Sequence, residues 1–466
     1  MSKCSKNAET FYSSLAIKIN GIHWYKAIVE RLVRKCLLPD GALSSIYPPH
    51  EGTAVYSEWD DLVPTLLLFG HYDFLLDQIV VAQKYLHKGL PIKYGGLVYS
   101  WRVDEFLAGL IEMDRYRSNH AVSNQIDRSL DGLQSTLMRS NGHVRGIYDP
   151  VDTYSPNVFY ARAGGLLEVL LNRNDLEKER MKGALECLDW WIENPFFIRQ
   201  GLFPCKWFSR RSIMELWANS GRFVPVSDGP FQKSGNSYIE RGGLKSFRKV
   251  LWIPSNRVQL MKDNSNLIFA FMEAWRKTGN SRYAATIIRW CKSVYTKMRS
   301  GPFICSTWHP RTGSADPRLS QNFTFIDILC DTYAFIDAAP IFLDIAHSLA
   351  RAWVERRWRD GLVPSTPNGN MATIDEQTDF AVSLVKLGEL SGDKRYREIA
   401  EDITAGAERR FLSSKGLVVS VDSQGNWMDY RVATKYNLLF AKALAAIHSH
   451  EKIYECPMLH DFLKDR

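Results

Sequence analysis

The chain of 466 residues is predicted to be an all-α protein in which helical hairpins close into a ring. Three observations predict this fold: a short glycine-containing tail recurs seven times, each tail ends an amphipathic segment, and a polar turn repeats inside the hairpins. A helical unit that returns about every 45 to 60 residues buries its apolar face only against its neighbours, as in repeat architectures. We therefore expect one domain over residues 1–466, with short strands at one face.

The tails read Gly-Leu-x-x-Ser or a close variant, and they begin at Gly41, Gly96, Gly142, Gly201, Gly301, Gly361 and Gly416. The polar turn is clearest in residues 278–283, Thr-Gly-Asn-Ser-Arg-Tyr, and in residues 391–396, Ser-Gly-Asp-Lys-Arg-Tyr. Glycine, asparagine and aspartate end one helix and begin the next. Each such turn is therefore expected to join the two helices of a hairpin.

Apolar spacing places six hairpins along the chain. The expected pairs are 62–69 with 74–86, 106–113 with 122–138, 160–171 with 181–192, 264–277 with 282–298, 325–338 with 341–358, and 378–390 with 395–411. In the last pair, Phe380, Leu384 and Leu387 fall near one face of a helix, as a 3.6-residue period requires.

The two ends of the chain are expected to complete each other. A helix near residues 22–38 lacks a preceding partner, and a helix near residues 432–448 lacks a following one. If they pair, six internal hairpins and one split hairpin close the ring. The alternative is an open solenoid, which needs polar caps at both ends. Seven tails favour seven hairpins, and six hairpins with one extra segment is the other count.

Residues 206–261 interrupt the repeat. They hold three tryptophans, several glycines and prolines, and many basic residues. A long irregular insertion in a compact domain is usually functional or disordered, and the aromatic content argues against disorder. We expect this insertion to form a lid or rim over the mouth of the ring, with packing on the outer wall as the alternative.

Composition argues against several classes of protein. No apolar run approaches the roughly 20 residues of a membrane-spanning helix, and the first residues are polar. The net charge of +8 is modest, and the basic residues do not gather in one run, so neither nucleic acid nor a membrane is an expected partner. The eight cysteines are scattered without a Cys-x-x-Cys pair. We expect reduced thiols and a cytoplasmic protein.

The hairpin repeat, the Gly-Leu-Val tails and the turns at 278–283 and 391–396 resemble the six-hairpin glycosidase superfamily and its α/α-toroid relatives. The resemblance covers nearly the whole chain and implies an (α/α)6 or (α/α)7 barrel. Such toroids include glucoamylases, unsaturated glucuronyl hydrolases, sugar 2-epimerases, uronate lyases, seven-hairpin mannosidases and lanthionine cyclases. The resemblance therefore implies the fold and leaves the activity open.

Acidic residues recur where the first helix of a hairpin begins. The resemblance implies that these helix starts line the substrate cavity, where the positive end of the helix dipole favours carboxylates and anionic ligands. Two carboxylates across a glycosidic bond can act as general acid and as base or nucleophile. Helix capping is the structural alternative for each residue. The catalytic candidates are Asp60, Asp61, Asp104, Glu105, Asp263, Asp375 and Glu376.

Aromatic and basic residues near these acids are candidates for substrate binding. Trp59 and Trp101 could stack on sugar rings, and the arginines of the insertion favour an anionic sugar. The full set is Trp59, Trp101, Tyr154, Arg210, Arg211, Arg241 and His309. Cysteine and histidine are not grouped as a zinc site requires, and no phosphate-binding glycine loop is present, so no metal and no cofactor is expected.

These features predict a carbohydrate-active enzyme that takes a small-molecule or oligosaccharide substrate. A glycoside hydrolase with a carboxylate pair, acting on a uronate-containing oligosaccharide, is the preferred hypothesis. A lyase, epimerase or cyclase that uses tyrosine or histidine on the same ring is the second hypothesis. A toroid that binds its ligand without catalysis is the third.

Overall fold

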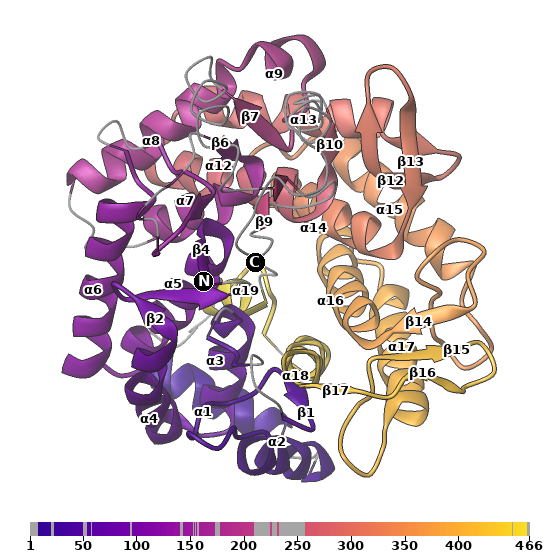
Figure 1. The fold of residues 1–466 in the computed structure, drawn as a ribbon. Coiled ribbons are helices and arrows are strands. Elements are labelled where there is room, and N and C mark those ends of the chain that lie inside the picture. The colour runs from indigo at the N-terminus through magenta and orange to yellow at the C-terminus, as the bar shows by residue number, and fades with distance from the viewer. Residues whose placement is uncertain are drawn as a thin grey trace.

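The computed structural model describes residues 8–19, 23–49, 54–56, 58–93, 96–139, 143–151, 153, 155, 158–172, 178–208, 224–225, 231–232, 257–449 and 451–463. Within them, seven helices form a closed inner ring (Figure 1). Each helix packs against the next one, and the last packs against the first. In chain order they are α3 (Trp59–Leu68), α5 (Ser100–Tyr116), α7 (Gly164–Asn172), α12 (Ser265–Thr278), α14 (Leu319–Phe335), α16 (Ile374–Ser391) and α18 (Thr434–His448).

Each inner helix also packs against an outer helix. Six outer helices follow their inner partners in the chain: α4 (Tyr72–Ala82), α6 (His120–Thr136), α8 (Lys178–Ile192), α13 (Ser281–Lys297), α15 (Pro340–Val354) and α17 (Arg395–Phe411). The seventh outer helix, α2 (His23–Lys35), lies near the N-terminus and packs on α18, which lies near the C-terminus. The described residues thus form seven hairpins, which confirms both the ring and the split hairpin that closes it.

Burial distinguishes the two layers. The inner helix α14 is buried without interruption from Leu319 to Thr332. The outer helix α13 buries a stripe at helical spacing that includes Tyr283, Ile287 and Val294. A helix with neighbours on all sides is apolar around most of its circumference, whereas a surface helix is apolar on one stripe. The two sequence patterns therefore assign the helices to their layers.

Short antiparallel strands lie next to the starts of the inner helices, as expected from the tails. β1 (Ile46–Tyr47) pairs with β17 (Val432–Ala433), so the first and last hairpins also meet through strands. The other sheets are β2 (Leu86–His87), β3 (Leu90–Lys93), β4 (Leu97–Tyr99) and β5 (Ile147–Tyr148); β6 (Val158–Tyr160) with β7 (Lys206–Phe208); β8 (Val224–Pro225) with β9 (Phe231–Gln232); β12 (Phe303–His309) with β10 (Val258–Gln259), β11 (Arg299–Ser300) and β13 (Gly313–Pro317); and β14 (Met371–Thr373), β15 (Ser420–Asp422) and β16 (Trp427–Asp429).

In four of the tails, one backbone residue is held by two hydrogen bonds from the side-chain amide of an Asn or Gln, an arrangement called here an amide clamp. The Asn or Gln lies on an inner helix or, for Asn264, directly before one. In each clamp, the side-chain oxygen accepts a backbone N–H of the tail, and the side-chain nitrogen donates to the carbonyl of the same residue, at 2.8–3.0 Å. These buried amides satisfy backbone groups that the short strands leave unpaired. The pairs are Asn264 with Phe203, Asn322 with Ile304, Gln377 with Val363, and Asn437 with Leu417.

Two terminal helices cross the ring at the C-terminal ends of the inner helices. Tyr12 of α1 (Ala8–Ile19) donates to Glu112 of α5 at 2.8 Å. Near α19 (Pro457–Leu463), the Tyr454 hydroxyl donates to Asp331 of α14 at 2.8 Å, and His460 Nε2 lies 3.1 Å from the same carboxylate. In Figure 1, α19 is seen near the middle of the ring. The terminal helices therefore plug this end.

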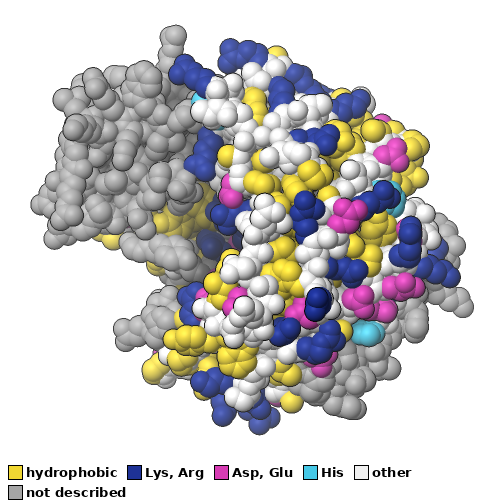
Figure 2. All heavy atoms as spheres, turned by 90° about the vertical axis from the view of Figure 1, so that its right-hand side faces the viewer, with side chains coloured by type: hydrophobic (Ala, Val, Ile, Leu, Met, Phe, Trp, Pro, Cys, Tyr) yellow, Lys and Arg dark blue, Asp and Glu magenta, His cyan; other side chains and the backbone are white. Residues whose placement is uncertain are grey.

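The surface seen in Figure 2 carries lysine and arginine side chains interspersed with acidic and apolar ones. None of the helices in the described ranges is long and apolar enough to cross a membrane. Six described cysteines are free thiols, whereas Cys456 is disulfide-bonded, so the expectation of reduced thiols is wrong for Cys456. Most of the insertion 206–261 lies outside the described residues, and its role as a lid or rim stays a prediction.

Candidate active site

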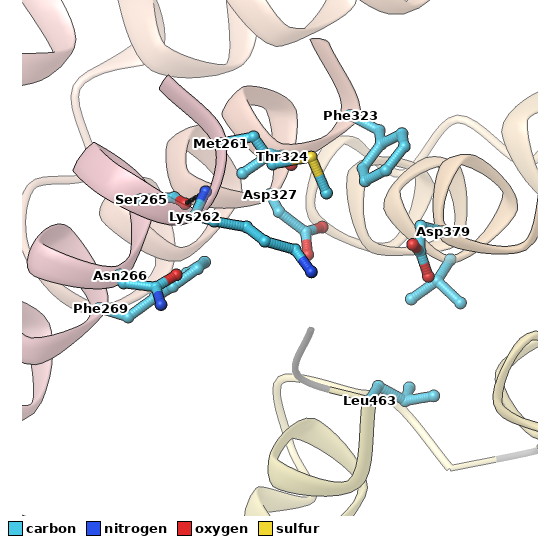
Figure 3. A pocket seen from close by; sticks show the side chains of 11 residues that line it. Met261, Lys262, Ser265, Asn266, Phe269, Phe323, Thr324, Asp327, Asp379 and Leu463 are labelled. Atoms are coloured by element: carbon cyan, nitrogen blue, oxygen red, sulfur yellow. Dashed lines mark hydrogen bonds between the residues drawn. The ribbon is translucent and has the colours of Figure 1, made fainter. Parts of the chain in front are cut away.

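A small pocket lies inside the ring, and its walls come from the start of α12 and from α14 and α16 (Figure 3). The volume that it encloses is about 20 Å³, room for roughly one water molecule. Asn266 and Phe269 line it from α12, Phe323 and Asp327 from α14, and Asp379 from α16. Lys262 extends into it from the turn η3 (Leu260–Asn264), and Leu463 of α19 lies below. The pocket thus combines charged, polar and aromatic side chains.

Glu105 is a buried carboxylate that its surroundings keep ionised. It lies on α5 with 5% of its surface exposed. Its Oε2 accepts a hydrogen bond from Arg102 Nη1 at 2.6 Å. Burial alone would raise the pKa of Glu105, but the positive charges of Arg102, Lys435 and Lys262 lower that pKa below its ordinary value. Glu105 is therefore negatively charged at neutral pH.

The neighbouring Asp104 has the opposite protonation state. Burial, followed by the negative charge of Glu105, raises the pKa of Asp104 to about 8. Its Oδ1 accepts the backbone N–H of Glu105 at 2.8 Å. A Cβ placed on Gly165 would lie 2.1 Å from Asp104 Oδ2 and 3.0 Å from Asn266 Nδ2. The protonated carboxyl of Asp104 thus lies beside Asn266, which lines the pocket.

Asp60 and Asp61 at the start of α3 differ in the same way. Burial and the charge of Asp61 raise the pKa of Asp60 well above its usual value, and both Asp60 carboxyl oxygens are buried without a hydrogen-bond partner among the described residues. Burial also opposes ionisation of Asp61, but Lys435 and Lys442 hold the pKa of Asp61 well below its usual range. Asp61 is therefore an ionised group that is already paired.

The lysines that pair with Asp61 come from the last inner helix. Lys435 Nζ lies 2.8 Å from Asp61 Oδ2, and Lys442 Nζ donates to Asp61 Oδ1. Because Asp61 belongs to α3 and both lysines to α18, these ion pairs join the first inner helix to the last. The geometry indicates that Asp61 serves ring closure.

The remaining acidic candidates lie on other walls of the ring. Burial and the charge of Asp375 raise the pKa of Glu376 to about 7, and Thr373 Oγ1 donates to Glu376 Oε2 at 3.0 Å. Both acids occupy the first turn of α16. Asp263 is partly buried in η3, directly before α12, and its charge acts on Arg162.

The residues expected to bind substrate have varied environments. Trp59 is 1% exposed, and its ring packs against Tyr56 and Phe106, as a core residue does. Trp101 is 5% exposed, and the Arg162 guanidinium lies 5.5 Å from its ring centroid. His309 ends β12, where its Nδ1 accepts the Arg311 N–H at 3.2 Å. Four others lie outside the described residues: Tyr154, Arg210, Arg211 and Arg241.

Buried and partly buried cations are the part of the site that sequence reasoning missed. They comprise Arg102, Arg162, Lys262, Lys386, Lys435 and Lys442. Two signals were available. Lys435 and Lys442 are seven residues apart on a largely apolar helix. Lys386 interrupts the apolar run of α16 and pairs with Asp327 of α14 at 2.9 Å. Among the described residues, no group of histidine, cysteine and acidic side chains could hold a metal ion.

Two adjacent glycines at the start of α7 give a matched test of this geometry. A Cβ at Gly165 would meet the Asp104 carboxyl, whereas a Cβ at Gly164 would lie 2.5 Å from the backbone nitrogen of Leu267. We expect Gly165→Ala to displace Asp104 and to lower turnover at least tenfold. Gly164→Ala should instead push α7 from α12 and cost about 1–3 kcal/mol of stability. Chemical denaturation and turnover measured on both variants check this, and equal effects of the two variants would contradict it.

Comparisons with solved structures identify the class of fold. The chain is similar to an α-1,2-mannosidase from Trichoderma reesei, with a TM-score of 0.62, 12% sequence identity, and coverage of 94% of each chain. It is also similar to a D-mannose isomerase (TM-score 0.57, 10% identity, 92% of this chain and 98% of that chain). A third similar structure is a cellobiose 2-epimerase from Spirochaeta thermophila (TM-score 0.55, 12% identity, 84% of this chain and 98% of that chain).

These likenesses span nearly the whole chain and confirm the resemblance to the six-hairpin glycosidase-like α/α toroids at the level of the fold. No protein-family model and no curated protein sequence matches the chain. The similar structures carry hydrolase and isomerase activities on one fold, so the activity has to be argued from the site.

Proposed function

We propose that this protein is a carbohydrate-active enzyme, and that it is a glycoside hydrolase with Asp104 and Glu105 as its carboxylate pair. The observation that supports the proposal is the opposite shift of the pKa values of two neighbouring carboxyls on α5. Neither carboxyl lines the pocket itself, and Asp104 lies near the pocket-lining Asn266. Asp104 is held protonated and Glu105 is held ionised. Environments that separate the pKa values of two carboxyl groups are how one site supplies an acid and a base at the same pH.

In this proposal, Asp104 gives its proton to the glycosidic oxygen as the bond to the anomeric carbon breaks. Glu105 attacks that carbon or removes a proton from the attacking water, and the proton count is restored when water adds to the sugar. Arg102 holds Glu105 in place through its 2.6 Å ion pair. The pKa values of Asp60 and Glu376 are also raised. Asp104 is preferred because it lies near the pocket-lining Asn266, with Gly165 next to both.

An epimerase or isomerase is the second candidate, and the likeness to a D-mannose isomerase and a cellobiose 2-epimerase supports it. The charge of Asp375, followed by burial, raises the pKa of Tyr436 to about 12, so its phenol stays protonated and could supply a proton. Histidine is absent from α3, α5, α7, α12, α14 and α16, and α18 has His448 only at its last position. Histidine-based epimerisation therefore has little support from these inner helices.

A screen of neutral and acidic oligosaccharides tests the proposal. Both the release of new reducing ends and the formation of sugar isomers should be measured, for the wild-type protein and for Asp104→Asn. We expect new reducing ends that depend on Asp104. Isomer formation without cleavage would replace the hydrolase with an epimerase, and binding without any product would favour a non-catalytic toroid.

A further inference from the structure

A groove lies between the outer helices α15 and α17, on the outside of the ring. Its volume is about 680 Å³, against about 20 Å³ for the pocket inside the ring. Both helices lie on the right-hand side of Figure 1, which is the side that Figure 2 turns toward the viewer. The residues that line the groove from α15 recur every three or four positions and so share one face of the helix. They are Asp344, His347, Ser348, Arg351 and Val354.

The α17 wall of the groove is fixed and carries no net charge. The Tyr396 hydroxyl and His347 Nδ1 lie 2.8 Å apart, so a hydrogen bond joins the two walls. Burial lowers the pKa of His347, which is therefore neutral at pH 7. Asp393 and Arg395 pair with each other at 2.6 Å, and Ile399 adds apolar surface. Among the residues that line the groove, unmatched charge is therefore confined to α15.

The unmatched charges on α15 have opposite signs. Asp344 and Arg351 are both exposed, and neither side chain forms an ion pair among the described residues. They are separated by two helical turns, about 10 Å along the helix. Ile341, one turn before Asp344, is 49% exposed, and Val354 lies one turn after Arg351. The face therefore reads apolar, acidic, polar, polar, basic, apolar, in the order Ile341, Asp344, His347, Ser348, Arg351, Val354.

This order of side chains is complementary to its own reverse. When a second α15 lies antiparallel to the first, with a two-fold axis between His347 and Ser348, Asp344 of each copy faces Arg351 of the other. Ile341 of each copy then faces Val354 of the other. A parallel copy in the same register would instead place each charge opposite itself, and like charges repel. Contacts that repeat in this way define an isologous interface with two-fold symmetry.

We propose that this face of α15 binds a second copy of the chain, and that α15 of each copy lies in the groove between α15 and α17 of the other. The two Asp344–Arg351 pairs set the register, as complementary charges across an interface do. The contact also covers Ile341, whose large apolar side chain is otherwise exposed. Because four helices make a small interface, we expect a dissociation constant of about 10 μM. The dimer is independent of the proposed catalytic carboxyls, which belong to the inner layer.

Sedimentation velocity of the full-length protein tests the dimer, over concentrations from about 1 to 100 μM that bracket this constant. The wild-type protein should shift from the mass of one chain toward that of two. Asp344→Arg and Arg351→Asp each place like charges opposite each other, so each should weaken dimerisation by a factor of roughly ten or more. Lys292→Glu, at an exposed position on α13, is the matched control for a reversed charge and should leave dimerisation unchanged.

Restoring the charge pairs separates this contact from a general effect of charge. An equimolar mixture of Asp344→Arg and Arg351→Asp should dimerise as the wild type does, because each arginine again faces an aspartate. The double variant Asp344→Arg/Arg351→Asp restores both pairs within one kind of chain and should also dimerise. A wild-type protein that stays monomeric through the series would overturn the inference and leave the groove to another ligand. A dimer that both single variants leave intact, or one that neither the mixture nor the double variant regains, would overturn it as well.

Discussion

Glu105→Gln is expected to lower turnover by a factor of about 10² to 10⁴, the scale of losing a catalytic base or nucleophile. The amide keeps the size of the side chain and cannot carry the negative charge that Arg102, Lys435 and Lys262 stabilise. The fold should survive, because α5 stays buried between α3 and α7. Turnover under saturating substrate, with the melting temperature of the same sample, measures both effects.

Glu273→Gln is the matched control for this substitution. Glu273 is also a buried glutamate on an inner helix, 2% exposed, and pairs with an arginine three residues later, Arg276, at 3.0 Å. It lies in the last two turns of α12, away from the pocket-lining start of that helix. We expect it to change stability and to leave turnover within a few-fold. Equal loss of turnover in both variants would show that Glu105 acts through packing.

Asp61→Asn is expected to destabilise the protein by about 3–5 kcal/mol, since it leaves buried ammonium groups without a counter-charge. Lys435 and Lys442 both contact this carboxylate, and both belong to the helix that closes the ring. The pKa of Asp61 is lower in the folded protein than in the unfolded chain. The stability that ionised Asp61 contributes is therefore fully present above its pKa in the unfolded chain, and it is lost as the pH falls through its pKa in the folded protein. Urea denaturation at pH 7 measures the cost.

Asp402→Asn removes an ion pair of a different kind. Asp402 is 69% exposed and lies 3.4 Å from Arg357, and exposed pairs contribute about 0–1 kcal/mol. A loss of stability as small for Asp61→Asn as for Asp402→Asn would contradict the assignment of Asp61 to ring closure. Turnover lost in a stably folded Asp61→Asn protein would instead return Asp61 to the catalytic candidates.

The closed ring could be predicted because each hairpin of a repeat protein packs against the hairpins next to it in the sequence. Segments 22–38 and 432–448 each lack a hairpin partner, and the structure pairs them as α2 and α18. The amide clamps could not be predicted from one sequence. Asn322 and Gln377 stand among the polar residues that open inner helices, and nothing local distinguishes a buried amide that binds a distant tail from a helix cap.

The sequence offered the acids as candidates and missed the cations around them, for an electrostatic reason. Asp104 and Glu105 became candidates from a local rule about carboxylates near helix starts; they lie in the second turn of α5, and their catalytic role stays a prediction. The protonation state of each depends on charges from other helices, such as Lys435 on α18 and Lys262 before α12. Only the closed ring brings these together. The Trp59 prediction followed the same local rule, yet its ring packs into the core.

The central claim is that Asp104 supplies the proton and Glu105 the negative charge, and the pH dependence of kcat/KM tests it most directly. With a cleaved oligosaccharide as substrate, the wild-type protein should lose activity as the pH rises through about 8, where Asp104 ionises. Activity should persist on the acid side to below the ordinary glutamate pKa, because the pKa of Glu105 is lowered. Asp104→Asn should lower kcat/KM and abolish the alkaline loss. An alkaline loss that remains unchanged in Asp104→Asn would contradict the account.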